Sequence, residues 1–225
     1  MVAGLGAPGI VGALPVANPT PTIDFIDPSS GTAGSFVVVN VFGSGFVPGS
    51  AVYVGTNVVS SNYESPTILG AAFLAPTTPG PVAVTVVNPA PGGGTSNAVT
   101  FTVTAPMPTI NYLVPASGTA GSSVDVNVIG TGFVPTSVVF FGATMVPTAY
   151  LDPFELIAFF TAPNTPGPVA VTVVNPAPGG GTSNAVTFTV VAGPAARITP
   201  TAGTPQSATV RTAFSAALQA TVTDQ

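Results

Sequence analysis

Short stretches in which every second residue is apolar run along the chain from residue 22 to residue 103. This period of two is typical of β-strands that bury one face. We expect strands at residues 22–26, 36–42, 51–54, 56–60, 67–74, 82–88 and 98–103. The segments between them, 28–31, 43–45, 48–49, 76–81 and 89–97, are rich in residues that favour chain reversal.

The same alternation predicts which face of each strand is buried, because residues two apart in a strand point to the same side. The residues expected to point inward together are Val37, Val39, Val41, Val52, Val54, Leu69, Ala71, Phe73, Val82, Val84, Val86, Val99, Phe101 and Val103. This set is large enough to form a packed core.

The pattern occurs twice. Residues 79–103 reappear unchanged as residues 166–190, and residues 45–48 (Gly-Phe-Val-Pro) return as residues 132–135, at the same offset of 87 residues. A repeat of this length suits an immunoglobulin-sized sandwich and is too long for a solenoid. We expect an all-β chain with tandem immunoglobulin-like β-sandwiches at residues 19–104 and 105–191, which meet at a short Pro-bounded linker (105–107). A tail (1–18) would precede them, and a partial third unit (192–225) would follow.

The composition excludes most catalytic chemistry. The chain contains no Cys, His or Lys, which supply most nucleophiles, general bases and soft metal ligands. With Arg197 and Arg211 as the only cations and a net charge of −5, it has no basic surface for nucleic acid. A lysine-free surface with 4% charged residues favours an extracellular location. The uncharged N-terminal stretch is too rich in Gly and Pro for a membrane-spanning helix.

Carboxylates are the remaining candidates for chemistry. Asp24 and Asp27 have no acidic counterparts in the second copy, and nothing indicates that Asp152 and Glu155 face each other across a cleft, as in a glycosidase. We interpret them as solvated acids rather than as catalytic residues or calcium ligands. We therefore expect a non-enzymatic protein without a cofactor or a metal.

Several motifs recur in both copies: Pro-x-Ile followed by x-Pro-x-Ser-Gly (21–31), Gly-x-Gly-Phe (43–46), Val54-Gly55 or Phe141-Gly142, and Asn-Ala-Val-Thr-Phe-Thr-Val (97–103). Together they resemble IPT/TIG domains over residues 18–191. The resemblance implies an immunoglobulin-like fold shared by cell-surface receptors, transcription factors and large bacterial surface proteins. The DNA-binding members use basic loops, which this sequence lacks, and the similarity is strongest to the uncharged, secreted bacterial versions.

Residues 193–224 have no counterpart in the repeats and resemble the first strands of an invasin-type bacterial Ig-like domain. About a third of a sandwich cannot close a core. We expect either that the natural protein continues beyond Gln225 or that another chain supplies the missing strands.

The two copies differ on the expected outward faces of two strands. Phe36, Val38 and Phe42 correspond to Ser123, Asp125 and Ile129, and Ile68, Gly70 and Ala72 correspond to Glu155, Ile157 and Phe159. Monomers rarely display contiguous apolar patches, so we interpret the apolar members as subunit contacts. The alternative is ordinary scatter of apolar surface residues.

The N-terminal tail carries a related hypothesis. Residues 5–16 are aliphatic and uncharged, so they could add as a strand to an exposed sheet edge, with a flexible linker as the alternative. The candidate self-assembly contacts are Leu5, Ile10, Val11, Leu14, Val16, Phe36, Val38, Phe42, Ile157, Phe159, Phe214 and Leu218.

These observations predict an extracellular structural protein, the building block of a bacterial surface filament or fibre. Its partner would be a second copy of the chain, added head to tail, with strand exchange as one route. One alternative is a spacer or adhesin segment of a larger surface protein that binds a glycan or a protein. Another is a phage fibre or an accessory domain of a secreted polysaccharide enzyme.

Overall fold

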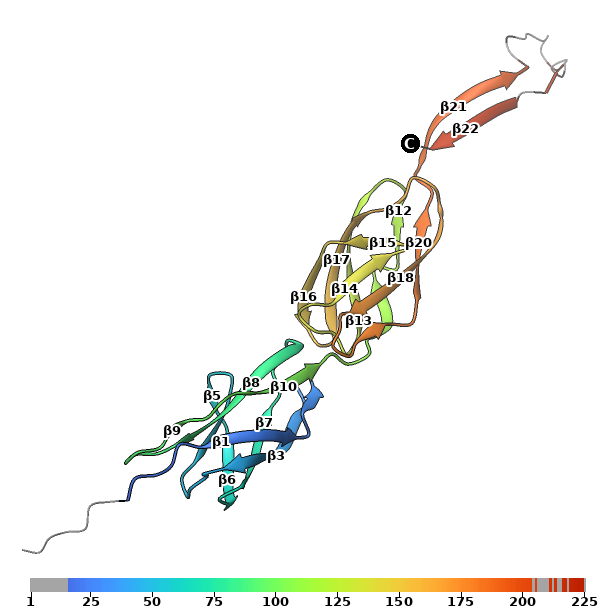
Figure 1. Ribbon diagram of the computed structural model, residues 1–225. Coiled ribbons are helices and arrows are strands. Elements are labelled where there is room, and N and C mark those ends of the chain that lie inside the picture. Colours follow the sequence, from blue (N-terminus) through green and yellow to red (C-terminus); the bar gives the residue numbers. More distant parts are fainter. Residues whose placement is uncertain are drawn as a thin grey trace, which may run out of the picture. The chain divides into compact units, whose positions relative to one another are not determined.

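A computed structural model describes residues 16–203, 205, 211, 213, 216–217 and 219–224 (Figure 1). The chain divides into two compact units, with the boundary between Thr104 and Ala105. The described residues form strands, bridges, bends and turns, and a helix that could cross a membrane is not found among them. The predicted all-β fold class, with tandem immunoglobulin-like sandwiches, is confirmed.

Two sheets make up the first unit. Its strands are β1 (Thr22–Asp27), β2 (Ser30–Thr32), β3 (Phe36–Ser44), β4 (Ala51–Val54), β5 (Asn57–Val58), β6 (Ser60–Ser65), β7 (Ile68–Leu74), β8 (Gly80–Asn88), β9 (Gly94–Thr95) and β10 (Val99–Thr104). One sheet has the order β1-β3-β7-β6 and the other the order β2-β10-β8-β4-β5, with β9 paired to β8. Neighbouring strands are antiparallel, except that β2 runs parallel to β10.

The second unit repeats this topology strand for strand. Its strands are β11 (Thr109–Val114), β12 (Ser117–Thr119), β13 (Ser123–Thr131), β14 (Val138–Phe141), β15 (Thr144–Val146), β16 (Thr148–Asp152), β17 (Glu155–Thr161), β18 (Gly167–Asn175), β19 (Gly181–Thr182) and β20 (Val186–Val191). The sheets have the orders β11-β13-β17-β16 and β12-β20-β18-β14-β15, with β19 on β18.

Two further strands follow. β21 (Ala195–Ala202) and β22 (Gln219–Asp224) pair with each other, and they join no other strand in the part of the chain that the structure describes. That residues 192–225 begin a third immunoglobulin-like unit therefore stays a prediction. Residues 1–15 lie outside the described residues, so the predicted strand addition by the tail also stays a prediction.

The seven expected strands of the first copy are close to the observed ones, with one error of connectivity. The predicted strand 56–60 is two short strands in different sheets, because the chain crosses from β5 to β6 at Val59. β6 was missed because its sequence, Ser-Ser-Asn-Tyr-Glu-Ser, has a single apolar residue that faces the core, Tyr63.

The segment 28–31 was expected to be a turn, but it contains most of β2. Gly31 lies in this strand, where an added Cβ would stand 2.8 Å from Val37 and 3.0 Å from Phe101. The strand thus passes close over the core without an apolar side chain that could reveal it in the sequence. The turn 89–97 likewise contains β9.

The core of the first unit lies between its two sheets. All the residues predicted to point inward belong to it, with Val82 and Val99 half-buried at its margin. Phe101, which is fully buried, meets Phe73 edge to face with 5.2 Å between ring centroids. The second unit has an equivalent core around Phe188 and Leu156.

A buried amide joins the entering chain to the β3–β4 loop, or to the β13–β14 loop in the second unit, at one end of each sandwich. Asn88, 2% exposed, donates to the carbonyl oxygens of Pro19 (2.8 Å) and Gly45 (2.6 Å) and accepts from the Ser50 hydroxyl (2.6 Å). Asn175 makes the same three hydrogen bonds to Pro106, Gly132 and Ser137 in the second unit. The predicted linker therefore begins inside the second unit, since the carbonyl oxygen of Pro106 is one of these acceptors.

The Gly-x-Gly-Phe motif belongs to this arrangement. An added Cβ on Gly43 would lie 2.0 Å from the Thr22 carbonyl oxygen, so only glycine fits where β3 meets β1. Gly45 has a φ of +73°, in the left-handed region that favours glycine, and presents its carbonyl oxygen to Asn88. Phe46 then turns into the core.

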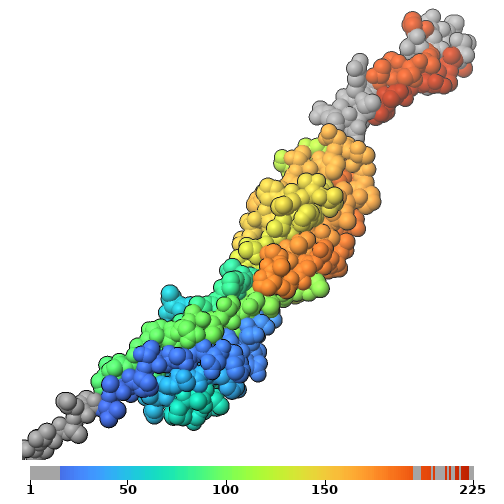
Figure 2. All heavy atoms as spheres, viewed as in Figure 1, coloured from blue at the N-terminus to red at the C-terminus, as the bar shows by residue number. Residues whose placement is uncertain are grey.

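A second amide fastens the first strand of each unit. The Asn97 side chain accepts from the Ile23 amide (2.9 Å) and donates to the Ile23 carbonyl oxygen (2.8 Å), and Asn184 does the same for Ile110. In Figure 2 the beginning of the first unit (blue) accordingly lies beside its end (green). These bonds occupy the outer backbone edge of β1 at Ile23, where a further strand would otherwise pair.

We predict that Asn88→Ala and Asn175→Ala each lower the unfolding free energy of one unit by roughly 2–4 kcal/mol. Each change leaves the buried hydrogen-bond partners of the amide without a partner. In chemical denaturation, Asn88→Ala should shift the unfolding transition of the first unit to lower denaturant, and Asn175→Ala should do the same for the second unit. Asn62→Ala, at an exposed position of β6, is the control and should change neither transition. Equal stability of all three variants would contradict the role given to the buried amide.

Candidate functional site

The acidic residues do not converge on a common point. Asp24 and Asp27 are exposed on β1, and Asp152 and Glu155 lie on either side of the β16–β17 turn. Among the described residues there is no group of three His, Cys, Asp or Glu side chains that could hold a metal ion.

Asp152 has a structural partner in its own turn. Its carboxylate accepts a hydrogen bond from the Phe154 amide at 2.7 Å. At the corresponding place in the first unit, the Ser65 hydroxyl accepts from the Thr67 amide at 3.2 Å. A side chain that closes a turn in both copies, as an acid in one and a hydroxyl in the other, has the role of a turn residue.

The pKa of Tyr150 is raised above its ordinary value. The larger cause is burial of the phenol, and the smaller cause is the negative charge of Asp152.

A cluster of large apolar side chains stands on the outer face of the first unit's β1-β3-β7-β6 sheet. We call it the first-unit face, and it comprises Phe25, Phe36, Val38, Phe42 and Leu74. Phe36 is 71% exposed and Leu74 67%, and they are paired across β3 and β7. Phe25 stacks on Phe42 with ring centroids 4.5 Å apart.

A β-bulge explains why Phe25 belongs to this face. The β1–β3 register shifts between Ile23 and Phe25, so Asp24 and Phe25 are both exposed while Ile23 and Ile26 stay buried. Nearby on the same sheet, the missing side chain of Gly70 helps to leave a shallow hollow of about 250 Å³ that Val38 also lines. The rest of its lining is mostly polar, with Asn40, Asn62 and Glu64 among its residues, so a polar hollow borders the apolar side chains of the first-unit face.

The equivalent surface of the second unit is more polar at three positions of β13 and β17, although Tyr112 and Phe159 are exposed on the same sheet. Ser123, Asp125 and Thr161 occupy the positions of Phe36, Val38 and Leu74, and all three are exposed. The two sandwiches thus share a topology but differ in the chemistry of this surface.

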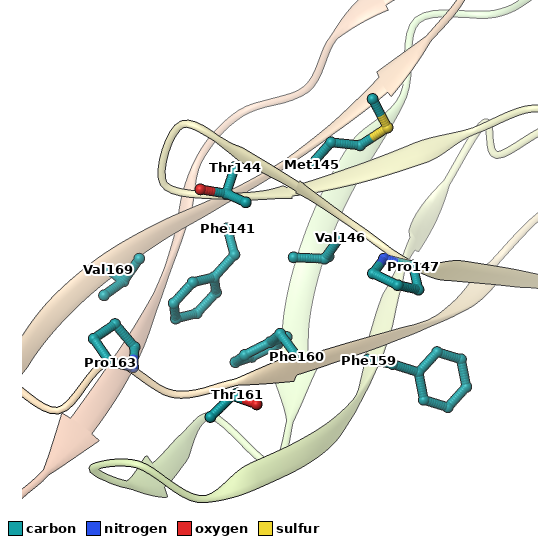
Figure 3. A pocket seen from close by; sticks show the side chains of 10 residues that line it. All are labelled: Phe141, Thr144, Met145, Val146, Pro147, Phe159, Phe160, Thr161, Pro163 and Val169. Carbon is teal, nitrogen blue, oxygen red and sulfur yellow. The ribbon is translucent and has the colours of Figure 1, made fainter.

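A different apolar feature lies in the second unit, where the chain passes from β15 to β16 and so from one sheet to the other. We call it the side pocket. It has a volume of about 420 Å³ and is lined by Phe141, Thr144, Met145, Val146, Pro147, Phe159, Phe160, Thr161, Pro163 and Val169 (Figure 3). Every one of these side chains is uncharged.

Aromatic rings make the inner wall of the side pocket. Phe141 and Phe160 stack at 4.1 Å between centroids, and both meet Phe188 edge to face at 5.6 and 5.3 Å. In Figure 3 Phe141 and Phe160 point toward each other, whereas the Phe159 ring points away from both. Phe159 is 38% exposed and Met145 is 63% exposed, so both belong to the rim.

An adjoining hollow shares part of this rim. It has a volume of about 490 Å³, and we call it the second hollow; its lining is Pro135, Thr136, Ser137, Val138, Met145, Val146, Pro147 and Thr148. Met145, Val146 and Pro147 line both depressions. The crossing from β15 to β16 is therefore a ridge with an apolar depression on each side.

The predicted contact residues have different surroundings. Phe36 and Val38 are exposed, Phe42 is half-buried beside Phe25, Ile157 is half-buried, and Phe159 is on the pocket rim. Val16 is 89% exposed. The other predicted contacts lie outside the described residues; they are Leu5, Ile10, Val11, Leu14, Phe214 and Leu218. Sequence reasoning missed Phe25, Leu74 and the side pocket.

Residues 21–103 and residues 108–190 each match the family model described as IPT/TIG domain. The chain belongs to the IPT/TIG domain family. The resemblance noted in the sequence is thereby confirmed for both units, and we refer to them as IPT/TIG domains 1 and 2.

Solved structures align with this chain at low sequence identity. They include the adhesin InvE of Yersinia pseudotuberculosis (15% identity, TM-score 0.49, 76% of this chain and 58% of InvE). A protein crystallised with a xylogluco-oligosaccharide aligns with 18% identity and a TM-score of 0.49, over 81% of this chain and 43% of that one. The D1–D4 ectodomain fragment of ICAM-5 aligns with 14% identity and a TM-score of 0.41, over 80% of this chain and 57% of the fragment. The chain thus spans less than two thirds of each of these proteins. A search of curated protein sequences found no match.

We predict that Asp152→Ala lowers the unfolding free energy of IPT/TIG domain 2 by about 1 kcal/mol, because the turn loses one hydrogen bond. Asp152→Ser should retain most of the stability, since Ser65 closes the same turn in domain 1. Thermal unfolding with and without calcium would check this. A calcium-dependent stabilisation that both variants lose would instead make Asp152 a metal ligand.

Proposed function

We propose that this chain is a non-catalytic, extracellular structural protein that associates with copies of itself to build a filament or fibre at a cell surface. The observation that carries the proposal is the first-unit face. Four of its side chains are more than half exposed: Phe25, Phe36, Val38 and Leu74. Phe36 and Leu74 are direct neighbours across β3 and β7, with Val38 two residues along β3, and exposed apolar groups of this kind are typical of an interaction site.

The energetics favour burial of this face. Covering a large apolar side chain contributes about 1.5–3 kcal/mol, so four of them together can offset much of the cost of association. No reorganisation of the backbone is needed, because β3 and β7 already hold Phe36 and Leu74 side by side.

The filament proposal requires that the first-unit face of one copy meets a different surface of the next copy. Domain 2 carries Ser123 and Asp125 where domain 1 carries Phe36 and Val38, so the same patch is not presented twice along one chain. A contact between unlike surfaces of identical chains is heterologous, and such contacts propagate into open filaments unless a rotation closes them.

The chemistry of the chain supports a structural role over the alternatives. A sequence without His, Cys or Lys offers few groups for acid–base or nucleophilic catalysis, and a net charge of −5 opposes binding to nucleic acid. The competing function is a spacer or adhesin segment of a larger surface protein, in which the same faces would meet a glycan or another protein.

The chain itself provides the substitutions that test the proposal. Phe36→Ser with Val38→Asp gives domain 1 the residues that domain 2 has at those positions, and we expect the double variant to lose self-association. The reciprocal control, Ser123→Phe with Asp125→Val, adds an apolar pair to domain 2 and should associate at least as strongly as the parent. Sedimentation velocity and negative-stain imaging over a concentration series give the readout.

A parent chain that stays monomeric at all concentrations would overturn the filament proposal and favour the spacer or adhesin. Equal association of the parent and the Phe36→Ser, Val38→Asp variant would instead exclude the first-unit face as the contact. Unchanged unfolding of the variant in denaturant would show that its loss of association does not come from misfolding.

A further inference from the structure

The side pocket differs between the two domains at the positions that shape its rim and inner wall. Four residues of domain 2 are larger or more apolar than their domain 1 counterparts: Phe141 replaces Val54, Met145 replaces Val58, Pro147 replaces Ser60 and Phe159 replaces Ala72. The two copies are identical over residues 79–103 and 166–190, and these four differences lie in the part of the repeat that has diverged. They give domain 2 an aromatic, apolar depression at this place.

The lining defines the chemistry of an occupant. Neither the side pocket nor the second hollow contains a charged side chain. A volume of about 420 Å³ is in the range of ligand-binding pockets, and the flexible thioether of Met145 can adapt to irregular apolar groups. The occupant should therefore be apolar, uncharged and large enough to cross the ridge between the two depressions.

The strand edges beside the ridge can accept an extended chain. β15 and β16 are the last strands of their sheets, and no described strand pairs with their outer edges. By contrast, Asn184 occupies the outer edge of β11 at Ile110. A peptide that adds to a sheet edge gains backbone hydrogen bonds while its alternate side chains enter pockets.

One segment of this chain has the matching chemistry. Residues 1–15 contain aliphatic side chains, including Leu5, Ile10 and Leu14, and no charged side chain. They lie outside the described residues and continue directly into Val16, which is 89% exposed. Asn18, two residues further on, is held to the rest of domain 1 by two hydrogen bonds. Its backbone amide donates to the Pro91 carbonyl oxygen, and its side-chain amide donates to the Pro89 carbonyl oxygen. Fifteen residues can extend up to about 50 Å from that point.

We propose that residues 1–15 of one copy bind along the β15–β16 crossing of domain 2 of a second copy, with apolar side chains in the side pocket and the second hollow. This inference rests on the proposed self-association and adds a second contact to that of the first-unit face, with a named donor and a named acceptor. Because every copy would carry both the donor segment and the acceptor site, the contact would repeat from copy to copy.

Met145→Glu tests the acceptor. It places a charge on the rim shared by both depressions, and because Met145 is 63% exposed the fold should tolerate it. The matched control is Val58→Glu, which alters the corresponding residue of domain 1 at 62% exposure. A fluorescent peptide with the sequence of residues 1–16 should bind the full-length Val58→Glu variant at least about tenfold more tightly than the Met145→Glu variant.

Mixing two full-length variants tests donor and acceptor together. The donor-only chain is Met145→Glu, and the acceptor-only chain carries Leu5→Asp, Ile10→Asp and Leu14→Asp. Both chains also carry Phe36→Ser and Val38→Asp, which remove the first-unit face as a contact. Each chain alone should then stay monomeric, whereas an equimolar mixture should form a complex of one copy of each and stop there. Sedimentation velocity distinguishes this product from a growing polymer.

The outcomes separate this inference from the proposed function. If the parent self-associates and Met145→Glu does so as well as Val58→Glu, the inference is wrong and the structural role stands. If the parent stays monomeric while the peptide binds and Met145→Glu abolishes binding, the acceptor site is supported and the filament is not. If the peptide binds the Met145→Glu and Val58→Glu variants equally, or binds neither, the proposed site is wrong. If the tail binds within its own chain instead, the mixture of the donor-only and acceptor-only chains will form no complex, which would contradict a contact between copies.

Discussion

The fold of each domain depends on a buried amide at the end of β8 or β18. Asn88 lies where the entering chain meets the β3–β4 loop, and its three hydrogen bonds satisfy one polar group of the entering chain and one at each end of that loop. An apolar residue of similar size would leave those groups unpaired in a dry environment, at a cost of about 1–3 kcal/mol each. The same set, Gly132, Ser137 and Asn175, occurs in the second domain. The outer surfaces have diverged between the copies, whereas this internal arrangement has not.

The hydrophobic alternation was sufficient to predict the core, because a sandwich buries one face of nearly every long strand. It failed where burial does not depend on large side chains. β2 passes over the core with Gly31 in place of an apolar residue, and β6 carries Tyr63 as its one apolar inward residue. The outward position of Phe25 depends on a bulge, which adds one residue and reverses the alternation; period-two reasoning cannot anticipate such an insertion.

Comparison of the two repeats predicted part of the candidate surfaces. Phe36, Val38 and Phe159 stood out because their counterparts are smaller or more polar, and the structure places all three where solvent reaches them. The side pocket was beyond such reasoning, since it combines β14 and β15 of one sheet with β17 of the other. Phe160 looked like any core residue in the sequence. Only the packing of the two sheets at the β15–β16 crossing reveals that its ring also lines an opening.

The parallel pairing of β2 with β10 gives each domain a mechanical property. Ser30, Gly31 and Thr32 lie beside Thr102, Val103 and Thr104, so a strand from the beginning of the domain runs alongside its last strand. Tension between the two ends of the domain pulls these strands in opposite directions along their own axes. The backbone bonds between them, with the bond from the Ala33 amide to the Thr104 carbonyl oxygen, are then stretched together in shear instead of opening one after another. β12 and β20 repeat this arrangement in domain 2, so a chain of such domains resists extension at every link.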